Sequence, residues 1–329
     1  MSIRVGIPRG LSYYNYFPLW EKFFHSLKVE LVLSPPTSSP IFNRGIVLAT
    51  DETCLPVKVF FGHVESLKGK QLDYLFLPRM VSMEKQTYLC PKLLGFPEVV
   101  TALVPDLPPI LTADFNLRHN PKELDKSFMS LGKQLGFGSK ETKEAARRAR
   151  LAQQRFVSLL YSGQEFEAAI KGLRVQKRPE EGQLTMGLLG HAYILYDEFT
   201  NLGLRKKLNR LGVRLLTPEG QQPEKCQVYL DAMPKQMFWS HSKKILGAGL
   251  SFIADPQIDG IINVSCFGCG PDSMVEDMIE RACRRSGKPF LSLSMDEHTG
   301  EAGMITRLEA FIDMLRRRVE IESNLSAHG

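Results

Sequence analysis

Four of the six cysteines occur in a pattern that suits the binding of a metal or an iron–sulfur cluster. Cys54 and Cys90 each stand alone, whereas Cys266 and Cys269 form a C-x-x-C pair. All four lie in loops that are expected to enter helices, and in three cases a proline follows the cysteine within two residues. Proline suits the first turn of a helix, because its missing N–H would have no partner there. The positive end of the helix dipole favours the thiolate, which is the form that binds metal.

The cysteine pattern by itself leaves several kinds of site open. A C-x-x-C pair alone can be a redox dithiol, half of a zinc site or two unrelated thiols. Four thiolates can hold either a structural zinc ion or a [4Fe–4S] cluster. Structural zinc usually draws its ligands from two close pairs, but here two cysteines are isolated, so the spacing favours a cluster held at a domain interface. Cys226 and Cys283 are interpreted as ordinary small core or surface thiols.

A few polar residues near the ends of expected strands are weaker candidates for the site. Arg79 stands at the end of one such strand, and His298 follows another, so each is a candidate catalytic group or anion contact. His191 follows a third strand and has a similar standing. Packing or capping roles are equally open for the two histidines. Charged or titratable side chains near the first two cysteines either tune a bound cluster or belong to the surface, namely Lys58, His63, Glu84 and Lys85.

The elements that must position these residues alternate between strands and helices. Apolar runs predict strands at 3–7, 29–33, 74–77, 110–112, 184–189, 213–216, 260–264 and 290–293. Apolar residues at three- and four-residue spacing predict helices at 17–27, 40–48, 56–67, 140–160, 200–211, 236–254, 271–286 and 302–318. This order predicts an α/β fold of two Rossmann-like or flavodoxin-like lobes with mostly parallel sheets. Ligands bind such sheets at the carboxyl ends of the strands.

The same pattern divides the chain into three parts. Residues 1–118 are expected to form an amino-terminal α/β lobe, and residues 181–329 a carboxy-terminal one. Between them, residues 119–180 are expected to form a helical connector, because a long stretch rich in Ala, Arg, Lys and Glu reads as a solvated helix.

Composition excludes several classes of function. The chain has 329 residues, of which 43% are apolar and 24% charged, as in an ordinary globular protein. The net charge of +6 is a small excess of 42 basic over 36 acidic residues and does not indicate a nucleic-acid partner. No apolar run reaches the roughly 18 residues of a membrane span, and the amino terminus lacks the features of a signal peptide. We therefore expect a cytoplasmic protein with reduced or metal-bound cysteines.

Several short motifs in combination resemble one known family. They include Gly-Ile-Pro-Arg at 6–9, the segments at 13–20, 33–37 and 51–58, Cys-Pro-Lys at 90–92, and the segments at 263–272, 296–303 and 306–311. In these motifs the sequence resembles the 2-hydroxyacyl-CoA dehydratase activase-related family, which includes the D-component-like iron–sulfur proteins. The resemblance covers nearly the whole chain.

This resemblance implies an oxygen-sensitive [4Fe–4S] cluster at the interface of two Rossmann-like lobes, in an anaerobic metabolism. The related dehydratases bind a cluster through three cysteines and leave one iron open for substrate. Here the match points to Cys54, Cys90 and either Cys266 or Cys269, or to all four. Four ligands favour low-potential electron transfer or activation of a dehydratase-like system. Three ligands favour an enzyme whose open iron dehydrates or reduces a small acyl-CoA, as a lyase or an ATP-coupled reductase component.

The family also implies a partner. Its dehydratases receive an electron from a separate ATP-hydrolysing activator, and this sequence contains no G-x-x-x-x-G-K-[ST] loop of its own. We therefore expect a separate ATPase activator, with a homodimer as an open alternative for the assembly. No nucleic-acid or membrane partner is expected. A zinc-stapled scaffold without redox function is the remaining alternative.

Overall fold

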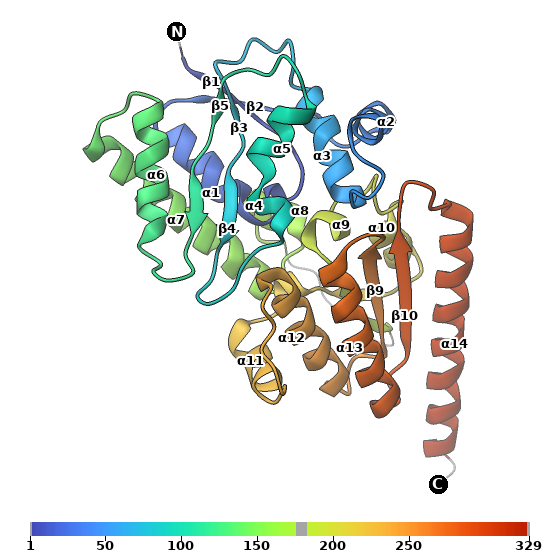
Figure 1. Cartoon of the computed structure of the whole chain (residues 1–329). Helices are drawn as coiled ribbons and strands as arrows, with labels where there is room; N and C mark the ends of the chain where they lie inside the picture. The colour runs from blue at the N-terminus through green and yellow to red at the C-terminus, as the bar shows by residue number, and fades with distance from the viewer. Residues whose placement is uncertain (1, 176–182, 328–329) are drawn as a thin grey trace. The chain divides into compact units, whose positions relative to one another are not determined.

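The computed structural model describes residues 2–175 and 183–327, with side chains as far as Ile321. It is an α/β protein whose sheets are parallel throughout the described residues, as the alternating pattern predicts (Figure 1). The chain forms two compact units. The first consists of the residues up to Val175 together with Met237–Lys243, and the second contains the rest of the described chain.

The first unit is built on a four-stranded parallel sheet. Its strands are ordered β2-β1-β3-β5, and they span Arg4–Ile7 (β1), Glu30–Leu33 (β2), Tyr74–Phe76 (β3) and Ile110–Leu111 (β5). A separate two-stranded parallel sheet pairs Arg79–Ser82 (β4) with Asp114–Asn116 (β6). The helices are Tyr13–Ser26 (α1), Ser39–Leu48 (α2), Leu55–Glu65 (α3), Pro91–Leu94 (α4), Phe96–Leu103 (α5), Glu123–Gln134 (α6), Ser139–Tyr161 (α7) and Phe166–Ile170 (α8).

The second unit has a sheet of the same kind. Its parallel strands are ordered β10-β9-β7-β8 and span Thr185–Leu189 (β7), Arg214–Leu216 (β8), Gly260–Cys266 (β9) and Phe290–Met295 (β10). Its helical segments are Ala192–Leu195 (α9), Leu204–Arg210 (α10), the 3₁₀ turn Pro218–Gly220, Pro223–Asp231 (α11), Ser240–Ala254 (α12, from Lys244 onward), Gly270–Ser286 (α13) and Glu301–Ala327 (α14). Every residue of β9 is buried, as expected for the interior of a parallel sheet covered on both faces.

Each sheet has one point where the chain reverses its direction of winding. In the first unit this point lies between β1 and β3, and in the second between β7 and β9. In open α/β sheets, ligands bind outside the carboxyl ends of the strands at such a switch point. A site in the second unit is therefore expected at the loops that follow β7 and β9.

The core of the first unit is rich in aromatic side chains. Trp20 and Phe24 of α1 each lie edge-on to Phe76 of β3, with ring centroids 5.2 Å apart in both pairs. Phe23 packs against Phe128 of α6, with ring centroids 4.5 Å apart. The long helix α7 also packs on α1, and its residues Ala145, Ala146, Ala149 and Phe156 are buried. The helices after residue 119 thus belong to the first compact unit.

A short segment from late in the chain completes the first unit. Residues Met237–Lys243 pack beside Tyr88, which pairs with Trp239 in a parallel bridge. The Tyr88 N–H donates to the carbonyl of Phe238 at 3.1 Å, and the Ser240 N–H donates to the carbonyl of Tyr88 at 2.9 Å. The Tyr88 and Phe238 rings pack against each other with their centroids 5.0 Å apart. This segment therefore supports the stretch of chain that leads directly into Cys90.

None of the helices within residues 2–175 and 183–327 combines the length and the apolar character that a membrane crossing requires.

Candidate cysteine and histidine–aspartate site

Three of the four candidate cysteines occupy the same local position. Cys54, Cys90 and Cys269 are the N-cap residues of α3, α4 and α13. In each helix a proline stands at the first or second position, as the sequence predicts. Because proline fixes its own φ and restricts the residue before it, this sequence pattern sets the backbone of the cap. The three thiols thus sit at helix starts by the same local rule.

Cys266 is placed differently. It is the last residue of β9 and pairs in register with Met295 of β10. Its N–H donates to Asp272 Oδ2 at 3.4 Å, and its side chain is buried. Cys266 therefore ends a strand, whereas Cys269, three residues later, begins a helix. All six cysteines lie in the described part of the chain, and none of them is in a disulfide.

In the first unit, the segments that carry Cys54 and Cys90 run beside each other. Lys92 Nζ donates to the carbonyl of Glu52 at 3.4 Å. Farther along both segments, Phe60 of α3 lies edge-on to Phe96 of α5 with ring centroids 4.5 Å apart. These contacts join α3 and the α4–α5 region, so both cysteines of this unit lie on neighbouring segments. Cys54 is buried and Cys90 is half-buried.

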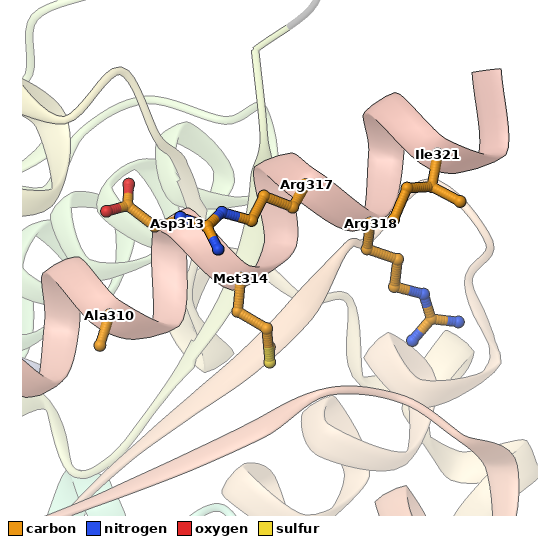
Figure 2. A pocket seen from close by; sticks show the side chains of 6 residues that line it. All are labelled: Ala310, Asp313, Met314, Arg317, Arg318 and Ile321. Carbon is orange, nitrogen blue, oxygen red and sulfur yellow. The ribbon is translucent and has the colours of Figure 1, made fainter. Parts of the chain in front are cut away.

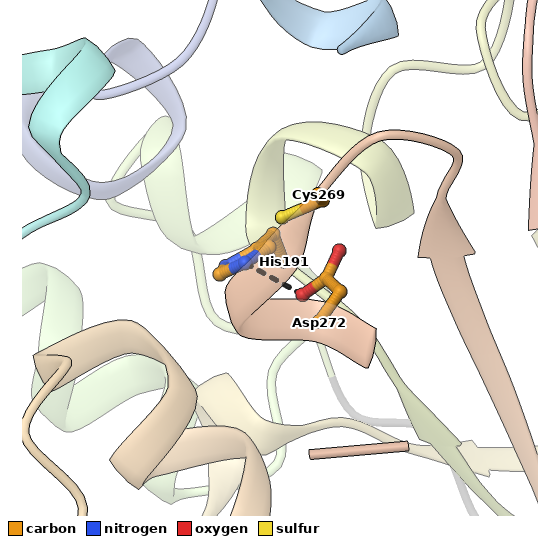
Figure 3. A group of neighbouring side chains, drawn as sticks. All are labelled: His191, Cys269 and Asp272. Carbon is orange, nitrogen blue, oxygen red and sulfur yellow. Dashed lines mark ion pairs between the residues drawn. The ribbon is translucent and has the colours of Figure 1, made fainter. Parts of the chain in front are cut away.

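In the second unit, Cys269 lies in a buried group with a histidine and a carboxylate. His191 Nε2 and Asp272 Oδ1 are 2.8 Å apart, and both side chains are about 95% buried. The ligand atoms of His191, Cys269 and Asp272 all lie within 4.8 Å of one another (Figure 3). His191 is the N-cap of α9 directly after β7, and Cys269 follows β9. The group therefore occupies the switch point of this sheet.

Asp272 belongs to this buried group, although residue type and spacing alone did not predict it as a site residue. It lies in the first turn of α13, where an acidic side chain is favoured by the helix dipole. That signal is visible in the sequence, three residues after Cys269. The contact of Asp272 with His191 is not visible in the sequence, because it depends on β7 and β9 being neighbours in the sheet.

His63 and Lys58, considered as groups that tune a cluster, lie inside α3. His63 is fully buried and hydrogen-bonds at both ring nitrogens, Nδ1 with Ser34 Oγ and Nε2 with Thr37 Oγ1, each at 2.9 Å. Burial, assisted by the charge of Arg9, lowers the pKa of His63 to about 3. The ring is thus neutral and fastens α3 to the loop after β2. Lys58 is also buried, whereas Glu84 and Lys85 are exposed.

Arg79 lies in an exposed ion-pair network. Its guanidinium pairs with Glu98 and with Asp114, and Nη1 donates to the carbonyl of Leu94 at 3.2 Å. The hydrogen bonds with Glu98 raise the pKa of Arg79 and lower that of the carboxylate. Arg79 therefore joins β4, β6 and the helices after Cys90.

His298 is exposed in the loop before α14. Its N–H donates to Asp296 Oδ1 at 2.9 Å, and Thr299 closes the same turn through its hydroxyl. The side chain of Asp296 thus organises the loop, and His298 is carried on its surface.

Other hollows in each unit differ in character from the cysteine segments. A narrow cavity at the switch point of the first unit is lined mainly by apolar side chains from β1, α1, β3 and α3, among them Ile7, Trp20 and Phe60. A shallow hollow of the second unit runs along one face of α14 and is lined by Ala310, Asp313, Met314, Arg317, Arg318 and Ile321 (Figure 2). All of these side chains come from one helix, so this hollow is an open surface.

Comparison with known families finds one matching model for each of two successive parts of the chain. Residues 4–220 match the family model described as CoA enzyme activase uncharacterised domain (DUF2229). Residues 227–315 match the model for 2-hydroxyglutaryl-CoA dehydratase, D-component. The first match contains Cys54, Cys90 and His191, and the second contains Cys266 and Cys269. A search of the curated proteins finds no match.

Proposed function

Because the chain belongs to the CoA enzyme activase family that matches more than half of its length, we propose that it is an iron–sulfur protein of the 2-hydroxyacyl-CoA dehydratase superfamily. In this proposal it binds one [4Fe–4S] cluster and serves low-potential electron transfer or the activation of a dehydratase-like system. The cysteines that hold the cluster are Cys54 and Cys90 of the first unit with Cys266, Cys269 or both of the second.

The observation that carries the proposal is the shared position of Cys54, Cys90 and Cys269 at helix starts. Thiolates are the usual ligands of iron–sulfur clusters, so the donor set fits the group. Backbone N–H groups at the start of a helix have no partner within it, and they point toward the capping residue. Such donors stabilise an anionic centre and the thiolates that bind it.

The residues of this chain would hold the cluster and control its surroundings. When bound, a [4Fe–4S] cluster supplies one-electron transfer, with a potential set by hydrogen bonds, charge and solvent access. Cys54 and Cys269 are buried and Cys90 is half-buried, so these side chains bring their sulfurs into environments that restrict solvent. The prolines after the cysteines restrict the backbone at the three helix starts whether or not a cluster is bound.

A second function is favoured by the placement of Cys266. Because Cys266 ends a strand while the other three cysteines cap helices, three equivalent ligands are available. Three ligands would suit an enzyme that dehydrates or reduces a small acyl-CoA substrate. His298 and Arg79 remain the candidate catalytic groups for that case.

The partner and the location follow from the same proposal. The activase and dehydratase descriptions of the matching families support a separate ATPase activator and an acyl-CoA ester as partners. The homodimer is the alternative assembly, and analytical ultracentrifugation tests it. A cytoplasmic location suits six cysteines outside disulfides, because thiols stay reduced there.

The decisive experiment is anaerobic purification and reconstitution, followed by iron, sulfide and zinc analysis. We expect about four iron and four sulfide per chain, and loss of both in Cys54→Ala and Cys90→Ala. Cys226→Ala and Cys283→Ala are the matched controls, because both thiols are buried in the second unit and neither residue is the N-cap of a helix. Stoichiometric zinc without sulfide would instead support the scaffold and contradict the cluster.

Two further measurements separate the two functions. Cys266→Ala and Cys269→Ala both lose the cluster if four cysteines bind it, whereas one of the two variants retains the cluster if three do. Electron paramagnetic resonance of the reduced protein with and without an acyl-CoA then tests for substrate at an open iron. An unchanged spectrum supports electron transfer to a partner, and a changed spectrum supports the enzyme.

A further inference from the structure

A buried histidine–aspartate contact ties the loop of the C-x-x-C motif to the neighbouring strand of the second unit. His191 and Asp272 meet at 2.8 Å, one from the turn after β7 and the other from the first turn of α13. Figure 3 shows the pair beside the side chain of Cys269. The two elements are adjacent because β7 and β9 pair in the sheet.

Asp272 makes a separate contact with each of its oxygens. Oδ1 pairs with His191 Nε2, and Oδ2 accepts the N–H of Cys266. One carboxylate therefore joins three points: the turn after β7, the last residue of β9 and the first turn of α13. Within that turn, the carbonyl of Cys269 accepts the N–H and the hydroxyl of Ser273, both at 3.1 Å. The backbone on both sides of the motif is thus fixed by hydrogen bonds.

The position of this pair indicates more than packing. Removing one partner of a buried polar contact leaves the other partner buried without a hydrogen bond, which is destabilising. Here the pair lies at the switch point of the sheet, and a ligand atom of each residue is within 4.8 Å of the Cys269 sulfur. Polar partners just outside a metal site commonly orient its ligands.

We propose that His191 and Asp272 are positioning residues that hold the Cys266–Cys269 loop, and above all Cys269, in the conformation that binds the cluster. This inference rests on the proposed function for the identity of the bound group. The positioning itself is a property of the cluster-free chain and can be measured there.

The test compares two substitutions of one residue. His191→Leu removes the ring nitrogen that meets Asp272, whereas the amide of His191→Gln places an N–H donor near the position of Nε2. In the cluster-free full-length protein, the rate of Cys269 alkylation by iodoacetamide is followed by mass spectrometry. We expect a rise of about tenfold or more in His191→Leu, because the buried contact with Asp272 is lost and the loop opens more often. His191→Gln is expected to stay near the wild-type rate.

Two internal controls separate positioning from general loosening. Tyr196→Phe removes two other hydrogen bonds of the same unit, those of the tyrosine hydroxyl with Thr217 and Glu219, and should leave Cys269 protected. The alkylation rate of the buried Cys283 reports on the unit as a whole. Equal Cys269 rates in the wild type and His191→Leu would overturn the proposal, as would a parallel rise at Cys283.

A second readout uses the reconstituted protein. His191→Leu and Asp272→Asn should lose iron to a chelator faster than the wild type and should show altered electron paramagnetic resonance of the reduced cluster. His191→Gln should restore both properties. If the wild type binds no cluster, the proposed function fails while the alkylation result still decides the positioning. If a cluster binds and neither readout changes in His191→Leu, the positioning role fails while the proposed function stands.

Discussion

Gly62 of α3 lies directly against the backbone carbonyl of Ile41 in α2, and a methyl group on this glycine would overlap with that oxygen. Gly45 of α2 makes the reciprocal approach to the carbonyl of Lys58 in α3. The two helices therefore cross with their backbones in contact. Because α3 begins directly after Cys54, this crossing fixes the helix that carries one candidate ligand.

The first prediction concerns this crossing. Gly62→Ala should lower the free energy of unfolding by about 1–3 kcal/mol, because overpacking outweighs the better helix propensity of alanine. Urea denaturation followed by circular dichroism measures the change. Gly303→Ala in α14 is the matched control, since a methyl group there meets no other atom within 4 Å. That variant should be neutral or slightly stabilised, and a Gly62→Ala protein as stable as the wild type would contradict the close contact.

The second prediction concerns the pH dependence of stability from His63. In the unfolded chain this histidine binds a proton near pH 6.5, but in the folded protein burial lowers its pKa to about 3. Between these values the unfolded chain binds more protons, so stability falls as the pH decreases from 6.5, by up to about 1.4 kcal/mol per pH unit. Urea midpoints between pH 4 and 7 should show a weaker slope in His63→Gln. Replacing the exposed His25 by Gln should leave the slope as it is in the wild type, and equal slopes in all three proteins would refute the assignment.

The third prediction concerns Arg79. Arg79→Met breaks the ion pairs with Glu98 and Asp114, which are more than half exposed. Because exposed ion pairs contribute little, the loss of stability should be at most about 1 kcal/mol and smaller still in 1 M salt. Thermal denaturation at low and high salt measures both effects. A variant with wild-type stability but without activity would instead indicate the catalytic role considered for this residue.

The fourth prediction concerns the thiol of Cys283. Burial raises its pKa to about 11, so at pH 8 it should be alkylated about a hundredfold more slowly than an ordinary thiol. Mass spectrometry of the native protein after a short exposure to iodoacetamide measures the rate. In 8 M urea the same cysteine should react at the ordinary rate. Rapid reaction in the native state would show that the environment around α13 is open to solvent.

Much of the fold is predictable from the sequence, because it is recorded in local patterns. The continuous apolar runs at β7 and β9 and the proline-led starts of α3 and α13 are visible in short windows of residues. The strands β4 and β6 are not, since they are short, partly polar and paired only with each other from distant parts of the chain. The pairing of β4 with β6 can be recognised only in the folded structure.

The candidate site divides in the same way. The cysteines and their prolines can be recognised from residue type and spacing, because an N-cap is a local structure. The contact of His191 with Asp272 depends on which strands are neighbours in the sheet. The strand order cannot be predicted from the residues close to either side chain in the sequence. His63 also shows this limit: its spacing from Cys54 suggests a role at the site, whereas its partners Ser34 and Thr37 place it in the packing of α3.

The return of residues Met237–Lys243 to Tyr88 constrains how the protein can be dissected. A truncation after Val175 would remove the strand partner of Tyr88, two residues before Cys90, along with the Phe238 ring that covers it. A split between the two family matches, near residue 223, would have the same effect on the amino-terminal fragment. If the gene is split at either boundary, the segment before Cys90 should therefore be less ordered in the amino-terminal fragment. Co-expression of both fragments should be needed to restore the native structure of this segment.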